Sequence, residues 1–205
     1  MPSDTASTRA RSRRPSPRER LLKAADELFY AEGINSVGID RVIDRADVAR
    51  ASLYSTFGSK DELIRGYLER RHEARRRRIE QAFARCDTPR ERLLAVFDVL
   101  ADRLSRPESR GCAFINAGAE SPLGSATEQA TQDYRAWVVE LFAEQARAAG
   151  AADPKALAAQ LILLYDGAAV VVRMDGPSTA PAAARQAAEL LVDAATKRPR
   201  RARAK

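Results

Sequence analysis

Four stretches with helical periodicity each begin with a hydroxyl residue that is followed three positions later by glutamate. The four pairs are Ser16 with Glu19, Ser59 with Glu62, Thr88 with Glu91, and Ser125 with Glu128. Each pair predicts a helix start, because hydroxyl and carboxylate satisfy two backbone amides reciprocally. Asp153-Pro154 predicts a fifth start, since proline is tolerated at the first helical position. No stretch alternates with a period of two, so we predict an all-α chain of about nine helices.

Residues 33 to 60 predict two short helices joined by a tight turn, followed by a third helix start. Apolar residues recur at helical spacing from Ile39 to Ala46, the turn lies at Asp47, and the second helix begins at Ala49 or Arg50. The second helix offers a face of small residues and one cation, which a major groove about 12 Å wide can admit. This face consists of Arg50, Ala51, Ser52, Ser55 and Thr56. The pattern indicates a helix-turn-helix that reads DNA.

The string from Val48 to Phe57, VARASLYSTF, with SKDEL behind it, resembles the DNA-binding signature of the tetracycline repressor family over roughly residues 17 to 68. The resemblance implies that Tyr54 and Lys60 contact phosphates. It also implies a homodimer formed through the last two helices, a palindromic operator in double-stranded DNA, and a C-terminal domain that binds a small-molecule effector. Asp47 stands where the family usually has glycine, but aspartate tolerates the left-handed conformation.

A second departure from the family pattern is Gly38, which replaces a hydroxyl residue near the start of the helix that begins at about Ile39. Glycine can cap a helix but has no side chain to hold a phosphate. The predicted DNA-binding residues are Gly38, Arg50, Ala51, Ser52, Tyr54, Ser55, Thr56 and Lys60. The alternatives are a core role for the ring of Tyr54 and ordinary solvated cations at Arg50 and Lys60.

The net charge of +7 is concentrated at the two ends of the chain. Residues 1 to 20 carry +4 and residues 197 to 205 carry +6, which leaves −3 for the middle. We predict disordered basic arms at residues 1–15 and 198–205 that strengthen DNA binding through counterion release, or that simply solubilise the chain. Between them we predict a helix-turn-helix domain at residues 16–62 and a helical ligand-binding and dimerisation domain at residues 63–197.

The predicted C-terminal helices carry aromatic residues that suit a pocket for a mostly apolar effector, with Asn116 or Asp166 as polar contacts, although the same aromatics can be plain core. Cys112 is either an inert buried thiol or a sensor of electrophiles or oxidants, and Arg110 is the one cation beside it in the sequence. The predicted ligand-binding residues are Phe97, Cys112, Phe114, Asn116, Tyr134, Trp137, Tyr165 and Asp166.

Enzyme chemistry finds little support in the sequence. The single histidine, His72, lies among arginines and is expected to face solvent, like the run from Arg75 to Arg78. Phosphate-loop and dinucleotide motifs are missing, and Cys86 and Cys112 do not have metal-binding spacing. We therefore predict no cofactor, no metal and no catalysis. The alternative to a ligand-responsive repressor is a constitutive architectural DNA-binding protein whose basic ends do the binding.

The predicted location is the cytoplasm. The apolar runs, such as Leu161 to Leu164 and Ala168 to Val172, fall short of the roughly 20 residues that a membrane span needs. No apolar core of a secretory signal follows Met1. The two cysteines fit a reducing compartment, in which no disulfide scaffold is expected.

Overall fold

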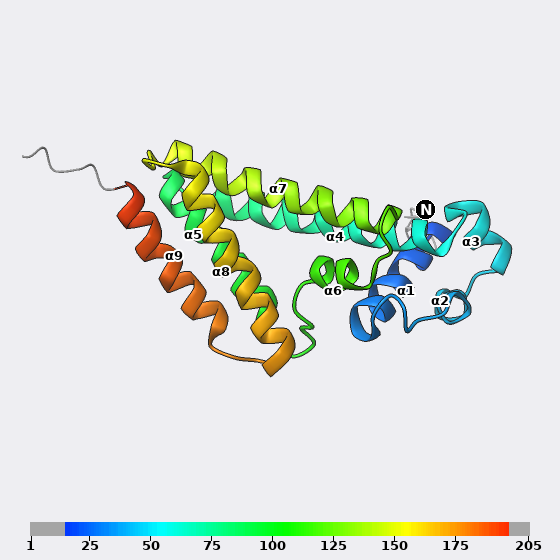
Figure 1. The fold of residues 1–205 in the computed structure, drawn as a ribbon. Helices are drawn as coiled ribbons and strands as arrows, with labels where there is room; N and C mark the ends of the chain where they lie inside the picture. Colours follow the sequence, from blue (N-terminus) through cyan, green and yellow to red (C-terminus); the bar gives the residue numbers. More distant parts are fainter. Residues whose placement is uncertain (1–14, 197–205) are drawn as a thin grey trace, which may run out of the picture.

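The computed structural model describes residues 15 to 196, so the predicted arms at residues 1–15 and 198–205 fall outside it except for Pro15. The described chain forms nine helices and no strands (Figure 1), which confirms the all-α prediction. The helices are α1 (Pro17–Glu32), α2 (Ile39–Ala46), α3 (Arg50–Phe57), α4 (Lys60–Phe83), α5 (Pro89–Leu104), α6 (Ala113–Glu120), α7 (Ala126–Ala148), α8 (Pro154–Asp175) and α9 (Ala180–Thr196).

The molecule has a small head, formed by α1 to α3, and an elongated body, formed by α4 to α9 (Figure 1). The long helix α4 begins at the head and runs beside α7 into the body. The short helix α6 lies between the head and the crossing of α5 and α8. Buried apolar side chains form one cluster that continues from the head, at Leu21 and Leu53, to Phe142 and Val192 in the body. The head is therefore anchored to the body through the core of α4.

All five predicted helix starts are present, but the reciprocal cap forms at only two of the four hydroxyl-glutamate pairs. Ser16 and Thr88 head complete capping boxes. At Ser59 and Ser125 only the hydroxyl accepts its backbone amide. The glutamates of these two caps are engaged elsewhere: Glu62 pairs with Arg65 at 2.7 Å, and Glu128 accepts from the amide of Gly124 at 2.5 Å.

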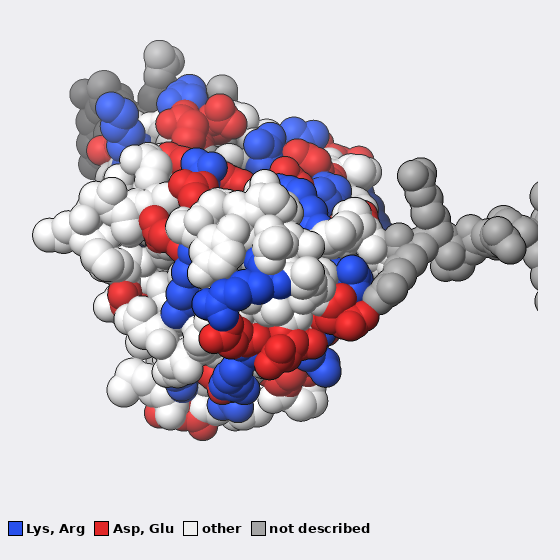
Figure 2. Space-filling model, turned by 90° about the vertical axis from the view of Figure 1, so that its right-hand side faces the viewer, with Lys and Arg blue, Asp and Glu red and all other residues white. Residues whose placement is uncertain are grey.

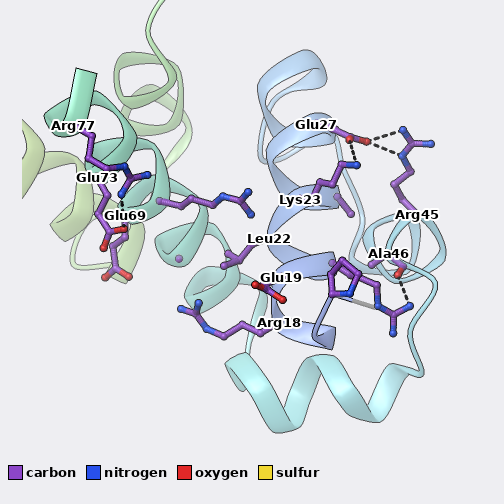
Figure 3. Close-up of a pocket in the computed structure, with 15 residues that line it drawn as sticks. Arg18, Glu19, Leu22, Lys23, Glu27, Arg45, Ala46, Glu69, Glu73 and Arg77 are labelled. Atoms are coloured by element: carbon purple, nitrogen blue, oxygen red, sulfur yellow. Dashed lines mark hydrogen bonds and ion pairs between the residues drawn. The ribbon is translucent and has the colours of Figure 1, made fainter. Parts of the chain in front are cut away.

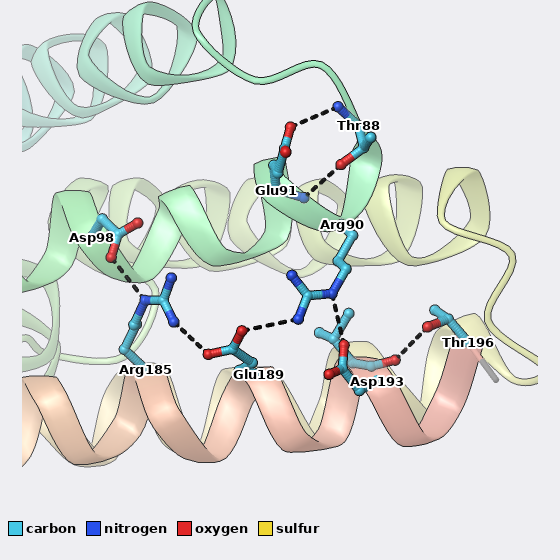
Figure 4. A network of polar contacts seen from close by, with 9 residues as sticks. Thr88, Arg90, Glu91, Asp98, Arg185, Glu189, Asp193 and Thr196 are labelled. Atoms are coloured by element: carbon cyan, nitrogen blue, oxygen red, sulfur yellow. Dashed lines mark hydrogen bonds and ion pairs between the residues drawn. The ribbon is translucent and has the colours of Figure 1, made fainter.

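Helix α9 is fastened to α5 by a chain of ion pairs (Figure 4). Arg90 reaches Glu189 at 2.9 Å and Asp193 at 2.7 Å. Arg185 joins Asp98 at 3.1 Å and the same Glu189 at 2.7 Å. Half-exposed ion pairs contribute only about 0 to 1 kcal/mol each, so this network fixes the register of α9 more than it stabilises the fold.

Helix α8 is the one described helix that is long and apolar enough to cross a membrane by length and composition alone. The sequence did not identify this helix as long enough, because only uninterrupted apolar runs were considered and Asp166 interrupts the run here. In the fold, α8 packs against α5, α7 and α9 and buries residues such as Leu161 and Tyr165. Its other face exposes Leu163 and Met174, at 73% and 78% of their surface.

Candidate DNA-reading face and ligand pocket

The turn between α2 and α3 has the geometry that the sequence predicted. Asp47 adopts the left-handed conformation at φ 51° and is the only described residue other than glycine with a positive φ. Arg20, on α1, holds this turn from behind: its Nη1 donates to the carbonyl of Ala46 at 3.1 Å and lies 3.3 Å from the Asp47 carboxylate. The strain that aspartate accepts here is thus offset by contacts with the first helix.

Helix α3 fully buries one side chain, Leu53, and packs the partly buried Phe57 against the core. Arg50, Ala51, Tyr54, Ser55 and Thr56 are exposed, and Ser52 is half-buried. The hydroxyls of Ser55 and Thr56 donate back to the carbonyl of Ser52 at 3.2 and 2.5 Å. The long side chains on this face are therefore those of Arg50 and Tyr54, and a DNA groove would meet few others.

Arg50 is held above this face by contacts inside the head. Its Nη1 lies 2.5 Å from the Asp40 carboxylate, and its guanidinium carbon lies 6.0 Å from the centre of the Tyr54 ring. Both partners of the ion pair are mostly exposed, so the pair is weak and exchangeable. The guanidinium can leave Asp40 for a base edge or a phosphate at small cost.

Gly38 and Lys60 occupy the two ends of the helix-turn-helix. Gly38 caps α2 with φ −71° and no side-chain hydrogen bond, and a Cβ built on it would meet no atom within 4 Å. Lys60 is the first residue of α4, half-buried, and forms no ion pair within the part of the chain that the structure describes. Seen end-on, Lys and Arg gather in a band across this end of the molecule, with Asp and Glu beside it (Figure 2).

A groove of about 860 Å³ lies behind the reading face, between α1, α2 and α4 (Figure 3). Several of its charged side chains are paired. Glu27 is shared by Lys23 at 3.9 Å and Arg45 at 2.6 Å, and Arg77 faces Glu73 at 3.6 Å. Arg18 and Arg70 also line the groove.

The body has a pocket of about 520 Å³ between α6, α7 and α8, which we call the aromatic pocket. Its residues are Phe114, Ile115, Thr131, Gln132, Tyr134, Arg135, Ala136 and Asp166. The rings of Phe114 and Tyr134 stack with centroids 3.6 Å apart. Arg135 and Asp166 form an ion pair across it. The pocket thus joins an aromatic wall to one pair of opposite charges.

The aromatic pocket contains three of the eight residues that the sequence suggested for a ligand, namely Phe114, Tyr134 and Asp166. Phe97 lies elsewhere, fully buried, with its ring 5.7 Å from that of Phe142. The amide of Asn116 donates to the carbonyl of Arg110 at 2.9 Å, away from the pocket.

The remaining three, Cys112, Trp137 and Tyr165, do not line the aromatic pocket but lie close behind Tyr134. Among the pocket residues that were not predicted, Thr131 and Arg135 are four residues apart on α7. Helical spacing from Tyr134 would have indicated Thr131, three residues before it, but not Arg135, which follows it directly.

Two side chains expected to face solvent are in fact inside the body. The ring of His72 is half-buried, 4.8 Å from Trp137 and 5.5 Å from Tyr134, and burial followed by the charges of Arg76 and Arg75 lowers its pKa. Arg75 is only 7% exposed. Its position was readable from periodicity, because it lies seven residues after the buried Leu68 and four before the buried Ile79.

Arg75 lies against the back of the aromatic pocket, where it meets only neutral partners. Its Nη1 donates to the hydroxyl of Tyr134 and to that of Tyr165 at 3.3 Å, and lies 4.0 Å from the sulfur of Cys112. Burial raises the pKa of the Cys112 thiol, but Arg75 and Arg103 outweigh it, so the net direction is down. Arg75 and Arg103 are therefore the cations that act on Cys112, whereas the sequence had indicated Arg110.

Several polar contacts join the head and the first turn of α4 to the rest of the body. The Glu120 carboxylate, at the end of α6, accepts from the amide of Asn35 at 2.8 Å. Asp61, one residue after Lys60, caps α7 by accepting from the amides of Ala126 and Thr127 at 2.8 and 3.2 Å.

A further contact is made by Tyr30 of α1, whose hydroxyl accepts from the amide of Arg110 at 2.9 Å and donates to the carbonyl of Gly111 at 3.2 Å. Helix α6 thus has Phe114 in the aromatic pocket at one end and Glu120 on the head at the other.

A three-helix head with an exposed reading helix, joined to a separate helical body, defines a helix-turn-helix DNA-binding protein. Residues 21–67 match the model of bacterial regulatory proteins of the tetR family, and residues 89–188 match the tetracyclin repressor-like C-terminal domain. The chain belongs to the tetR family of bacterial transcription regulators. Because proteins of this family are transcription regulators, the chain is a DNA-binding regulator and not an enzyme.

Individual relatives agree with this assignment. The crystal structure of SCO4454, a TetR-family transcriptional regulator from Streptomyces coelicolor, is 33% identical, covers 88% of this chain and 96% of that chain, and superposes with a TM-score of 0.83. The transcriptional regulator LmrA of Bacillus subtilis is 27% identical over 71% of this chain and 79% of its own. The transcriptional activator FasR of Mycolicibacterium smegmatis is 34% identical over 48% of this chain, which spans only 44% of that protein.

Proposed function

We propose that the protein is a homodimeric repressor that binds a palindromic operator and leaves it when a small, mostly apolar effector occupies the aromatic pocket. The observation that carries this proposal is the exposed face of α3. There Arg50 and Tyr54 are the long side chains among small residues, while Leu53 of the same helix is buried in the core. Two such helices related by a two-fold axis can enter successive major grooves, about 34 to 36 Å apart. The protein would act in the cytoplasm, on chromosomal DNA.

Dimerisation through α8 and α9 is supported by the apolar residues that these helices expose. Leu163, Met174 and Leu190 are 72 to 78% exposed, and Val170 and Val171 are partly exposed beside them. Large apolar side chains gathered on two neighbouring helices typically mark an interface. A two-fold axis at this end of the body would place two heads side by side, as a palindrome requires.

Effector control is supported by the position of α6. A ligand that enters the aromatic pocket meets Phe114, and the same helix reaches Asn35 of the head through Glu120. The pocket volume lies in the range of about 300 to 1,000 Å³ that small-molecule sites occupy. An effector acts only if it binds the two head positions unequally, and a coupling of about 1 to 3 kcal/mol is enough for release.

The proposal is tested by selecting bound fragments from the source genome and footprinting the best one. We expect protection with dyad symmetry and a preference for this site over mixed-sequence DNA of at least about 1,000-fold. An architectural protein would bind both alike. Effectors are then screened for loss of operator binding, and Phe114→Ala should abolish the response while Phe97→Leu, outside the pocket, should preserve it.

Transcriptional activation is the second candidate function, because the relative FasR is a transcriptional activator. In vitro transcription from the selected promoter separates the two modes. A repressor lowers transcript yield when it is added and the effector restores it, whereas an activator raises the yield.

A further inference from the structure

Three arginines from two helices converge on a small cavity in the body. Arg75 and Arg78 of α4 and Arg103 of α5 line a space of about 30 Å³, whose other residues are Val99, Leu100 and Tyr165. No acidic side chain lines it. Arg78 and Arg103 also line a groove of about 590 Å³ that lies between α1, α4, α5 and the segment before α6. We call the groove and its inner cavity together the arginine groove.

The positive charges at the inner end of this groove have no counter-charge among the described residues. None of Arg75, Arg78 and Arg103 has a carboxylate within 4.0 Å in the part of the chain from residue 15 to residue 196. Arg75 meets hydroxyls, a thiol and ring faces. The Nη1 of Arg103 donates to the carbonyl of Gly111, while its Nη2 is buried without a hydrogen-bond partner.

Such an arrangement is unfavourable for the empty protein. Like charges held close together repel each other, and a buried donor without an acceptor has lost its hydrogen bonds to water without gaining others. Burial and the nearby charge of Arg75 lower the pKa of Arg103, which reflects the same repulsion. An oxyanion placed between the guanidinium groups would remove both costs.

The outer part of the groove has room for the remainder of such a ligand. Its apolar surface comes from Tyr30, Ala31 and Ala74, and the Arg71 guanidinium stacks on the Tyr30 ring at 3.9 Å. Two of its three acids are already engaged, because Asp26 pairs with Arg71 at 2.6 Å and Glu27 pairs with Arg45 outside the groove, while the third, Glu108, is exposed. In the groove of Figure 3, by contrast, Lys23, Arg45 and Arg77 each face a carboxylate.

We propose that the arginine groove binds an amphipathic organic anion, with a carboxylate or phosphate head between Arg78 and Arg103 and an apolar tail over Tyr30 and Ala74. The planar guanidinium fork matches the two oxygens of a carboxylate or phosphate. The head group lies at the mouth of the inner cavity, which by itself holds about one water molecule. This site is separate from the aromatic pocket and goes beyond the proposed function, because it needs neither DNA nor an effector in that pocket.

The test is calorimetric titration of the full-length protein with octanoate, compared with octanol and octylammonium as neutral and cationic probes of the same length. Octanoate should bind, and the other two should bind about tenfold more weakly or not at all. Inorganic phosphate at increasing concentration should compete with octanoate for the head-group position. Equal binding of octanoate and octanol would overturn the proposal, because the charge would then play no part.

Arg78→Gln and Arg76→Gln form a matched pair of variants. Both remove one exposed cation from the same turn of α4, but only Arg78 lines the groove. Arg78→Gln should weaken octanoate binding about tenfold, as expected for the loss of one charge-assisted contact, and Arg76→Gln should leave it nearly unchanged. If the two variants behave alike, the anion does not bind at this place. Neither side chain is buried, so folding is expected to survive both changes.

A thiolate at Cys112 would be a competing counter-charge, since the sulfur lies 4.0 Å from Arg75. Cys112→Ser removes this thiol, and octanoate affinity should stay within about twofold of that of the unmodified protein. Octanoate binding that appears only in Cys112→Ser would show that the thiolate already neutralises the cluster, and the proposal would be wrong. Operator binding is not involved in these measurements, so the site and the proposed repressor function can fail separately.

Discussion

The head and the body place arginine in opposite surroundings. In the head, Arg50 is exposed and forms a weak ion pair with Asp40, which a DNA partner can replace. In the body, Arg75 is enclosed by aromatic rings and hydroxyls with no carboxylate beside it. The head can therefore vary its contacts without affecting the fold, whereas the body ties its charge to the packing of the core. Substitutions should separate binding from stability in the first region and couple them in the second.

The largest effect is expected for removal of a core ring from the body. Phe142 is fully buried between Phe97 and Tyr165, so Phe142→Ala should lower the free energy of unfolding by about 3 to 5 kcal/mol. Tyr54→Ala removes an aromatic ring from the head that is 45% exposed and should cost about 1 kcal/mol or less. Denaturant unfolding at one fixed protein concentration measures both. Similar losses would remove the distinction between the two regions.

The next effect concerns DNA affinity rather than stability. Arg50→Ala should cost about 1 to 3 kcal/mol of operator binding and relax base preference within each half-site. Tyr54→Phe and Lys60→Ala should weaken binding to all sequences to a similar degree, because phosphate contacts carry no sequence information. Affinity measured against a panel of single-base operator variants distinguishes the two patterns. A uniform loss for Arg50→Ala would assign this residue to the phosphates as well.

Asp61 tests the junction between the two regions. Asp61→Asn keeps the size of the side chain but removes the charge that caps the first turn of α7, at a cost of about 0.5 to 2 kcal/mol. Asp87→Asn is the control, since Asp87 is outside this contact. If the junction transmits the effector signal, the operator affinity of Asp61→Asn should also respond less to effector. Unchanged stability and unchanged response would exclude Asp61 from coupling.

The single histidine provides a pH test of the interior of the body. The folded state lowers the pKa of His72, so it binds fewer protons than the unfolded state, whose value lies near 6.5. The contribution of His72 to the free energy of unfolding is fully present above pH 6.5 and decreases as the pH falls below that value. The decline should be smaller than the Asp61→Asn loss because the ring is only half-buried. His72→Gln should flatten the slope of unfolding free energy between pH 7 and about 5, above the range near 4.5 in which carboxylates titrate.

The smallest effect is a gain. Gly38→Ser adds a hydroxyl at the N-cap of α2, where the backbone has an ordinary φ and the space is open. Stability should rise by a few tenths of a kcal/mol, and DNA affinity should rise modestly if the hydroxyl reaches a phosphate. Thermal unfolding and operator titration measure these changes. A decrease in stability or in DNA affinity would mean that position 38 requires glycine for another reason.

The sequence predicted the head better than the body, and the reason is physical. Caps, the turn at Asp47 and the anchor Leu53 depend on residues close together in the chain, so local rules are sufficient. The aromatic pocket depends on how α6, α7 and α8 pack, and sequence spacing did not reveal that Asn116 points away from it. Arg75 was misplaced because four consecutive arginines were treated as one solvated run, although the helical repeat separates the first from the others.

The exposed face of α3 lets operators and regulators change together. Leu53 and the partly buried Phe57 fix the helix against the core, so substitutions at its exposed positions carry little folding penalty. New operator preferences are therefore accessible by single substitutions at positions such as Ala51 and Ser55, each tolerated before it becomes useful. A duplicated copy of this gene could acquire a separate regulon while its sensing body stays the same. For the same reason, libraries randomised at these exposed positions should yield regulators that act independently in one cell.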